Sequence, residues 1–269
     1  MIIAIKGQVA SYHHAATRQW YGENCEILPC ASFADVFASY ESGESDAIVT
    51  AVENTTYGSI NQVYQLIEAC SAPIIGEVKL PVHHQLIAAP GTRLNDIREV
   101  YSDPVALAQC QDLLRNQLTD AEAIEFIDTA AAVEYIASLD RRDVAAIASS
   151  EAAALHHMPI VQADVHDDAH NITRFLVLGD EPTPKDANRA SLVITTNHEP
   201  GSLVQVLQIF ADADVNLAKL QSQPIVGQPW RYKFFIVVET AGDELRNLVA
   251  KLEKSDHEVT LLGEYKAAF

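Results

Sequence analysis

The sequence is poor in basic residues and contains no long apolar run. Lys and Arg together number 18 against 37 Asp and Glu, so the formal net charge is −19. A surface of that charge repels nucleic acid and anionic membranes, and neither is expected as a partner. Because no apolar run reaches about 18 residues, no membrane-spanning helix is expected either.

Cysteine is scarce and scattered. The four cysteines form no CxxC pair, which favours free thiols in a reducing compartment. The N-terminus, Met1 to Gly7, already has the pattern of a strand and carries no basic leader or small-residue cleavage site. No signal peptide is therefore predicted, and a cytoplasmic protein is expected. The cysteines are Cys25, Cys30, Cys70 and Cys110.

The common motifs for cofactors and nucleophiles are also missing. The sequence has no GxGxxG, no Walker loop and no GxSxG, and the turn after the first strand, at residues 7–10, holds a single glycine. No nucleotide cofactor is therefore expected. His166 and His170 have the spacing of a helical metal pair, but they stand in an Asp-rich stretch typical of a solvated loop. No metal is predicted.

Strands and helices alternate over residues 99–156. Three apolar segments of strand length each run into a short polar helix start, and a helix follows each start. This alternation is typical of a parallel α/β sheet, in which the carboxyl ends of the strands meet at one edge. The expected strands are 99–101, 124–127 and 144–148, the starts are Ser102-Asp103-Pro104, Asp128-Thr129 and Ser149-Ser150, and the helices are 105–114, 130–139 and 150–156.

These three helix starts have a chemical implication. Unpaired N–H groups and partial positive charge at helix N-termini favour carboxylates or phosphates. Three such starts at one sheet edge therefore indicate a site for an anionic molecule, without any lysine cluster. Each start taken alone has a plainer interpretation, because Ser, Thr and Asp are simply the best N-caps.

A second polar cluster lies in residues 167–178. An amide, a hydroxyl and a guanidinium stand directly before an apolar strand expected at residues 175–178; they belong to Asn171, Thr173 and Arg174. Such donors suit the binding of an anionic small molecule. The alternative is a loop whose polar groups satisfy only its own backbone.

The C-terminal part forms a unit of its own. Residues 181–190 are polar and contain proline, as in a linker. Residues 191–269 then predict the order βαββαβ of the ferredoxin-like split unit. A unit of this size buries a modest core, so pairing with another copy is expected. The expected strands are 191–196, 215–224, 230–240 and 259–265, with helices from 201 and over 243–254.

Several segments, in chain order, resemble motifs of the monofunctional prephenate dehydratases. The resemblance covers nearly the whole chain and ends in a segment similar to the ACT regulatory domain of that family. The matching segments are Val52-Glu53-Asn54-Thr55 with Gly58-Ser59, Val100 to Cys110 (similar to V-Y-S-H-P-Q-A-L-A-Q-C), Asp128-Thr129-Ala130-Ala131-Ala132, Asn171-Ile172-Thr173-Arg174-Phe175, Gly201-Ser202-Leu203-Val204 (for G-A-L-V) and Gln221-Ser222-Gln223-Pro224 (for E-S-R-P).

The resemblance implies a fold and a reaction. The catalytic domain, residues 1–180, would have two lobes like a periplasmic binding protein, about 1–75 with 160–180 and 76–159. It would be a lyase of phenylalanine biosynthesis that converts prephenate to phenylpyruvate by decarboxylation and dehydration, without a cofactor.

The resemblance also assigns roles to residues. Thr173 would hydrogen-bond or protonate the departing ring hydroxyl, while Asn54, Ser102, Gln109 and Thr129 would orient the substrate. Arg174 would either pair with a carboxylate or brace the site, and both interpretations stay open. Glu53 and His84 are further substrate-binding candidates.

The C-terminal resemblance implies regulation by phenylalanine between paired ACT domains, in a homodimer or homotetramer. The effector site would use residues 201–204 (Gly201, Ser202, Leu203 and Val204) with Gln221 and Ser222. Gln221 and Gln223 remove both charges of E-S-R-P, which predicts inhibition of altered strength.

Two further departures concern the catalytic part. The family turn G-P-x-G-S-F/Y-S reads Gly7 to His13 without the proline and the second glycine, and Asp103 replaces a histidine. Two other functions remain open: arogenate dehydratase, with the same fold and chemistry, and a non-catalytic sensor of small molecules.

Overall fold

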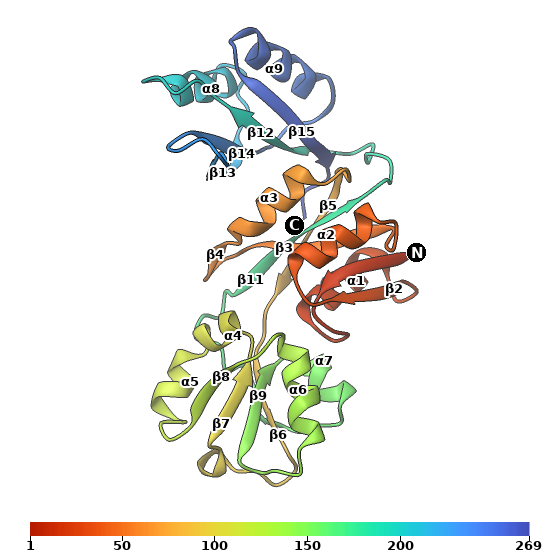
Figure 1. Ribbon diagram of the computed structural model, residues 1–269, viewed down its shortest axis with the longest axis vertical. Helices are drawn as coiled ribbons and strands as arrows, with labels where there is room; N and C mark the ends of the chain where they lie inside the picture. The colour runs from red at the N-terminus through yellow and green to blue at the C-terminus, as the bar shows by residue number, and fades with distance from the viewer. Residues whose placement is uncertain (269) are drawn as a thin grey trace. The chain divides into compact units, whose positions relative to one another are not determined.

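The computed structural model describes residues 1–268, and the chain divides into two compact units (Figure 1). Unit 1 comprises residues 1–60 and 78–175; unit 2 comprises residues 61–77 and the chain from residue 176 onward. Two strands, β5 (Ile74–Pro81) and β11 (Ile172–Gly179), run from one unit into the other. Over the described residues, no helix combines the length and the apolar character that crossing a bilayer requires.

The first sheet has the strand order β2-β1-β3-β11-β5, with β4 paired to β3. The strand β1 pairs in parallel with both β2 and β3. Its central residues and those of β3 are buried and, apart from Thr50, apolar, as expected for a sheet covered on both faces. The elements of this part are β1 (Ile2–Lys6), α1 (Tyr12–Tyr21), β2 (Glu26–Cys30), α2 (Phe33–Glu41), β3 (Ala47–Asn54) and β4 (Gly58–Ser59).

The second sheet of unit 1 has the order β10-β6-β9-β7-β8. The strand β7 is parallel to both β8 and β9, which confirms the expected alternation and the common edge. The two remaining strands are antiparallel additions. The elements are β6 (Gln85–Ala88), the 3-10 turn η1 (Leu94–Asp96), β7 (Glu99–Ser102), α4 (Pro104–Ala108), α5 (Gln111–Asn116), β8 (Glu122–Glu125), α6 (Thr129–Ser138), β9 (Val144–Ala148), α7 (Ser150–Leu155) and β10 (Ile160–Gln162).

The single helix expected at residues 105–114 is wrong, because the chain forms two helices that break at Gln109 and Cys110. The second of them, α5, is capped from a distant part of the sequence. The carboxylate of Asp167 accepts the backbone N–H groups of Gln111 and Asp112 at 2.8 and 3.0 Å. A cap that arrives through tertiary structure leaves no mark in the local pattern.

Unit 2 contains the ferredoxin-like order predicted for the C-terminal part. Its four strands are antiparallel in the order β13-β14-β12-β15, and both helices lie on one face of the sheet (Figure 1). Apolar side chains of the helices and strands form one buried core. The elements are β12 (Arg189–Thr195), α8 (Ser202–Ala211), β13 (Leu217–Pro224), β14 (Tyr232–Val238), α9 (Gly242–Lys254) and β15 (Glu258–Tyr265).

The helix α3 (Asn61–Ala69) packs against the same sheet. The Tyr64 ring lies 4.6 Å from that of Phe235, and Lys219 Nζ lies 5.4 Å from the Tyr64 ring centre. Lys233 also forms an ion pair with Glu68. These contacts place residues 61–77 in unit 2, whereas the sequence grouped residues 1–75 in one lobe.

Arg189 is the first residue of β12, although the sequence placed it in the linker. Its guanidinium donates from Nη1 to Glu77 Oε1 at 2.9 Å and lies, through Nη2, 3.2 Å from Glu239 Oε1. The Glu77 side chain is 0% exposed. A carboxylate buried to this degree requires its cation, because an unpaired buried charge is strongly destabilising.

We therefore expect Arg189→Ala to lower the free energy of unfolding by about 3–5 kcal/mol, because it removes a guanidinium that is paired with the buried Glu77 carboxylate. Urea denaturation followed by circular dichroism measures the change. Arg93→Ala is the matched control, since Arg93 pairs with Asp96 at the surface and should lose less than about 1 kcal/mol. Equal losses in the two variants would contradict the interpretation.

Candidate active site

Asn54 ends β3, and its amide is held in one orientation. Its Oδ1 accepts the backbone N–H groups of Thr56 and Tyr57, both at 2.9 Å, and the Thr56 hydroxyl at 2.7 Å. Because backbone N–H groups only donate, the amide oxygen must face this turn. The Nδ2 group therefore points the other way, with two hydrogens to donate.

The hydrogens of Asn54 reach the start of β11. Asn54 Nδ2 donates to Asn171 Oδ1 at 2.6 Å and to Thr173 Oγ1 at 2.9 Å. The strand begins at Ile172, earlier than expected, so Thr173 lies inside it. The Thr173 oxygen accepts from Asn54, which leaves the hydroxyl proton of Thr173 available to a ligand.

Gln109 joins the network from the break between α4 and α5. Its Nε2 donates to Asn54 Oδ1 at 2.9 Å and to Thr56 Oγ1 at 2.8 Å. Its Oε1 therefore faces His84 Nε2, 2.9 Å away. The sequence predicted Asn54, Gln109, Thr173 and His84 as site residues, and the structure joins all four.

The tautomer of His84 follows from that geometry. Burial lowers the pKa of His84 to about 4, so the imidazole is neutral near pH 7. Because Gln109 presents an oxygen, His84 carries its proton on Nε2 and leaves Nδ1 as an acceptor. The single proton of the Tyr12 hydroxyl faces two acceptors, that Nδ1 at 3.1 Å and the His83 carbonyl at 2.9 Å.

Two more members of the network are Tyr12, which the sequence did not indicate as a site residue, and Asn171, which it indicated only as part of the polar cluster before β11. Tyr12 follows the first turn, and burial raises its pKa. Asn171 is buried, and its Nδ2 has no hydrogen-bond partner among the described residues. Its place two residues before Thr173 on the same strand face was the available signal, since side chains alternate along a strand.

The three helix starts differ from the expectation that they offer free N–H groups. Asp103 accepts the N–H of Val105 at 2.9 Å, and Ser149 accepts that of Ala152 at 3.1 Å. Asp128 accepts the N–H groups of Ala130 and Ala131 at 2.6 and 3.1 Å. Two of the three starts thus already hold a carboxylate of the protein itself, which weakens them as anion sites.

Ser102 and Thr129 stand apart from the hydrogen-bonded network. The Ser102 hydroxyl is fully buried and donates to the Ile147 carbonyl at 2.6 Å, within the second sheet. Thr129 is buried as the first residue of α6. Their roles as substrate ligands stay predictions.

Arg174 lies on β11 next to Thr173, on the opposite strand face. Its Nη1 is 3.5 Å from Glu53 Oε2, and the Arg174 side chain is 11% exposed. Glu53 is the neighbour of Asn54 on β3. The contact favours the bracing interpretation of Arg174 over direct pairing with a substrate carboxylate.

The altered first turn keeps a glycine-like shape. Ala10 stands where the family has its second glycine, and it adopts a φ of 68°, in the left-handed region. A Cβ on Gly7 would lie 2.0 Å from Asp128 Oδ2, so this turn passes close to the start of α6. His13 Nε2 accepts the N–H of Ala51 at 3.2 Å, which makes His13 a structural acceptor.

One cation near these residues was not singled out from the sequence. Lys6, the last residue of β1, lies with Nζ 3.4 Å from Asp103 Oδ2. The pair is mostly shielded from solvent, with 24% and 21% of the two side chains exposed. Lys6 and Asp103 connect the first sheet of unit 1 to the second.

Unit 2 has a cavity of about 150 Å³ at the start of α8. Ser202 and Leu203, two of the predicted effector residues, line it. Ser222 pairs with Phe234, another lining residue. Gln221 and Gln223 lie on the same face of β13 as Lys219, which contacts Tyr64. Because side chains alternate along a strand, the two glutamines point to the other face of the sheet from Ser222. The remaining lining residues are Thr196, Asn197, His198, Glu199, Arg231 and Tyr232.

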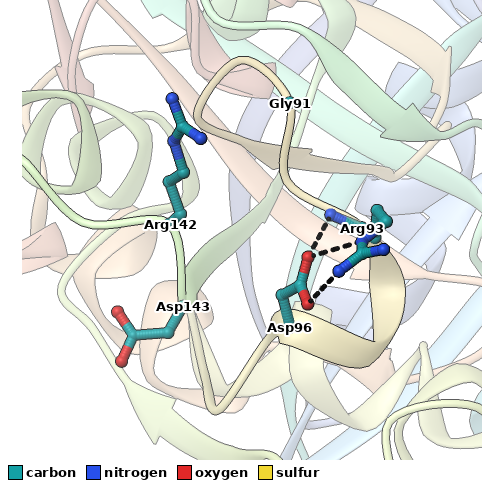
Figure 2. Close-up of a pocket in the computed structure, with 5 residues that line it drawn as sticks. All are labelled: Gly91, Arg93, Asp96, Arg142 and Asp143. Atoms are coloured by element: carbon teal, nitrogen blue, oxygen red, sulfur yellow. Dashed lines mark hydrogen bonds and ion pairs between the residues drawn. The ribbon is translucent and has the colours of Figure 1, made fainter.

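A surface hollow of about 470 Å³ in unit 1 is polar and largely self-paired (Figure 2). Arg93 donates to Asp96 at 3.0 and 3.2 Å, and Asp143 pairs with Arg141 at 2.8 Å. Gly91 and Arg142 complete the lining. None of the predicted site residues lies there.

The chain is a mixed α/β protein with a neutral, hydrogen-bonded cluster of buried side chains and an appended ferredoxin-like domain. A family model described as prephenate dehydratase matches residues 3–183, and one described as ACT domain matches residues 190–257. The chain belongs to the prephenate dehydratase family, a family of hydro-lyases, and carries a C-terminal ACT domain. The resemblance noted from the sequence is thereby confirmed.

Among the individual proteins that resemble the chain, two carry dehydratase names and one is described as an acylase. The chain is 36% identical to an arogenate dehydratase/prephenate dehydratase of Arabidopsis thaliana, over 98% of this chain and 72% of that protein. A prephenate dehydratase of Arthrobacter aurescens in complex with L-Phe matches with a TM-score of 0.89 and 25% identity, covering 100% and 90% of the two chains. GqqA, described as a novel type of quorum quenching acylase, matches with a TM-score of 0.87 and 29% identity, covering 100% and 98%.

The burial of His13 makes stability depend on pH. Burial lowers the pKa of His13 to about 3, against about 6.5 in an unfolded chain. A depressed folded pKa stabilises the native state above the unfolded pKa, and this contribution is lost as pH falls from about 6.5 toward 3. We expect the urea midpoint to fall as the pH is lowered through this window. His13→Gln should reduce the accompanying loss of unfolding free energy by at least about 1 kcal/mol, and so flatten the slope of stability against pH. An unchanged slope in the variant would contradict the assignment.

Proposed function

We propose that this chain converts prephenate to phenylpyruvate, with Thr173 as the donor to the departing hydroxyl. The observation that carries the proposal is the hydrogen bond from Asn54 Nδ2 to Thr173 Oγ1, 2.9 Å long. In this bond a lone pair of the Thr173 oxygen accepts a hydrogen from Asn54. The hydroxyl proton of Thr173 then points away from Asn54 and can be donated to the substrate. Membership of the prephenate dehydratase family supports the reaction.

The chemistry asks little of the protein. The bond between ring and carboxylate breaks, its electron pair enters the ring, and carbon dioxide leaves. The ring C–O bond breaks at the same time, and the hydroxyl leaves as water after taking a proton. Because aromatisation drives the reaction, a fixed donor at the leaving oxygen supplies most of what is needed.

The neutral network is suited to this task. Asn54, Gln109 and His84 have no net charge near pH 7, and each fixes the orientation of the next. Asn171 Nδ2 adds a second donor beside Thr173. Two preorganised donors at the developing negative charge lower the barrier without reorganisation.

We expect Thr173→Ala to reduce kcat on prephenate by about 10²–10⁴-fold with a small change in KM, because it removes the donor to the leaving group. Thr173→Ser should retain most of the turnover. Asn54→Asp, of equal size, should lose turnover like Thr173→Ala, since a carboxylate accepts the Thr173 proton instead of directing it outward. An ultraviolet assay for phenylpyruvate measures all three, and full turnover in Thr173→Ala or Asn54→Asp would refute the proposed roles.

The substrate is decided by parallel assays. The Arabidopsis relative carries both dehydratase names, and arogenate differs from prephenate by an amino acid side chain in place of the pyruvyl group. Prephenate and arogenate should be compared by kcat/KM with the same preparation. An N-acyl amide substrate belongs in the series because of the acylase GqqA. Binding of prephenate without turnover of any substrate would favour the sensor.

We further infer that L-Phe binds at the unit 2 cavity and regulates the activity. The related Arthrobacter enzyme was solved with L-Phe. The cavity has both partners that a free amino acid requires, because Arg231 suits the carboxylate and Glu199 the ammonium group. Apolar Leu203 and Phe234 suit the ring.

A pairing of two chains through unit 2 is part of this proposal. The strand β13 lies at an edge of its sheet, with open backbone groups that a second copy can pair. Large apolar side chains are exposed in the same unit, among them Trp230 at 79% and Val204 at 64%. A homodimer or homotetramer formed this way would complete the effector site.

We expect Arg231→Gln to weaken inhibition by L-Phe by about tenfold or more, the loss typical of a charged hydrogen bond, while kcat without L-Phe stays unchanged. Arg246→Gln is the control, because Arg246 pairs with Asp243 on the surface of α9. Calorimetry and inhibition curves measure the effect. Equal inhibition of the two variants would place the effector site elsewhere.

A further inference from the structure

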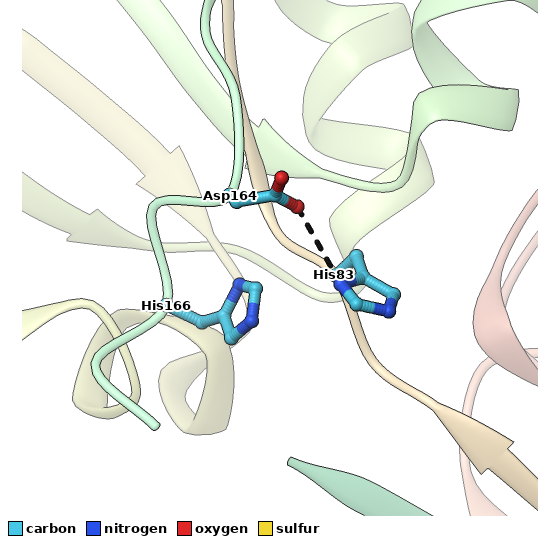
Figure 3. A group of neighbouring side chains, drawn as sticks. All are labelled: His83, Asp164 and His166. Atoms are coloured by element: carbon cyan, nitrogen blue, oxygen red, sulfur yellow. Dashed lines mark ion pairs between the residues drawn. The ribbon is translucent and has the colours of Figure 1, made fainter. Parts of the chain in front are cut away.

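Three side chains from two distant segments converge in unit 1 (Figure 3). They are His83, just before β6, and Asp164 and His166, after β10. Their ligand atoms all lie within 4.8 Å of one another. His83 Nδ1 lies 3.4 Å from Asp164 Oδ1, and the centres of the two imidazole rings are 5.3 Å apart.

We propose that His83, Asp164 and His166 bind a divalent transition metal, with Zn²⁺ as the best fit. Two imidazole nitrogens and one carboxylate oxygen form a donor set that zinc and its neighbours accept. Water would take the remaining position. Mg²⁺ and Ca²⁺ prefer all-oxygen sets and are poorly served by this one.

A buried nitrogen provides independent support. His166 Nδ1 is inaccessible to solvent and has no hydrogen-bond partner among the described residues. Buried polar atoms normally have a partner, and an orphan points to a ligand or an ordered water. A metal bound by His166 would fix the orientation of its ring, and a metal bound through Nδ1 would give this nitrogen a partner.

The backbone holds the three residues in place. Val165, between two of the ligands, is buried in the core, and its N–H donates to the His84 carbonyl at 2.8 Å. Gln85 then links the segments, because its Nε2 donates to the His83 carbonyl at 3.2 Å and its Oε1 accepts the Asp164 N–H at 3.2 Å. The ligand positions are thus set by tertiary contacts on both sides.

The remaining adjustment is small. In a tetrahedral site with bonds of about 2.0–2.2 Å, ligand atoms lie about 3.4 Å apart, so separations of up to 4.8 Å must shorten by at most about 1.4 Å. The side chains of His83 and Asp164 are 57% and 66% exposed, so a small rotation of either is not opposed by core packing. His166 is the more buried member and acts as the fixed point.

His170 does not belong to this cluster, although its spacing from His166 was the metal signal in the sequence. Its side chain is 93% exposed, and its Nδ1 lies 3.7 Å from Asp168 Oδ1. It is therefore a control histidine in the same loop. A chain with net charge −19 attracts cations generally, so this control is needed.

The test is a calorimetric titration of the full, metal-free chain with Zn²⁺. Excess Mg²⁺ is present throughout to occupy unspecific carboxylate sites. We expect one equivalent per chain and a rise in Tm on binding. Asp164→Asn and His166→Ala should each weaken binding at least tenfold, while His170→Ala binds as the wild type. Asp164→Asn changes an exposed side chain, so it tests the site even where His166→Ala folds poorly.

Co²⁺ absorption spectra identify the ligands directly. A spectrum without thiolate bands, lost in Asp164→Asn and kept in His170→Ala, supports the site. Three outcomes overturn it: no saturable binding of one equivalent, equal weakening by His170→Ala, or thiolate bands that assign the metal to a cysteine.

Discussion

The orientation of one amide, that of Asn54, determines the direction of every hydrogen bond around Thr173. Two backbone N–H groups face its oxygen, and turning the amide over would leave both without an acceptor. Each lost partner would cost about 1–3 kcal/mol, so the alternative is not populated. From this fixed point the orientation of Gln109, the tautomer of His84 and the free proton of Thr173 all follow.

The same constraint explains why the site is neutral. Its members come from β3, β11 and the break after α4, and each is buried or nearly so. A buried charge among them would need a partner that the network does not provide. The charged groups stand at its margins instead, where Lys6 faces Asp103 and Arg174 faces Glu53. The network itself therefore offers only directed neutral donors, and the cations Lys6 and Arg174 already face carboxylates of the protein.

The sequence predicted most of the architecture because its signals are local. Short patterns of apolar residues predict the strands β7, β8 and β9 and the βαββαβ order. Short patterns of capping residues predict the starts of the helices that follow these three strands. The break at Gln109 was missed because Asp167, more than fifty residues away, caps the second helix. The apolar residues Leu107, Cys110 and Leu113 continue the helical spacing across that break, so the pattern alone indicated one helix.

For the candidate site, motifs identified residues but not their contacts. Asn54, Gln109 and Thr173 were expected to share a ligand, yet only the structure shows that they bond to one another. Tyr12 became visible as a site residue only through those contacts, and so did the bond between Asn171 and Asn54. The cluster of His83, Asp164 and His166 was hidden for the same reason, since its members are adjacent in space and not in sequence.

Side chains alternate in direction along an extended backbone, so two consecutive residues, His83 and His84, lie in different environments. His84 faces Gln109 and the Thr173 network, while His83 faces Asp164 and His166. The segment is fixed on both sides, because Val82 donates to the Asn171 carbonyl and Val165 donates to the His84 carbonyl, each at 2.8 Å. A metal on His83 would therefore act on the Thr173 network through this backbone, without touching the substrate. Since Asn171 is bonded both to Val82 and to Asn54, the two environments share one rigid connection.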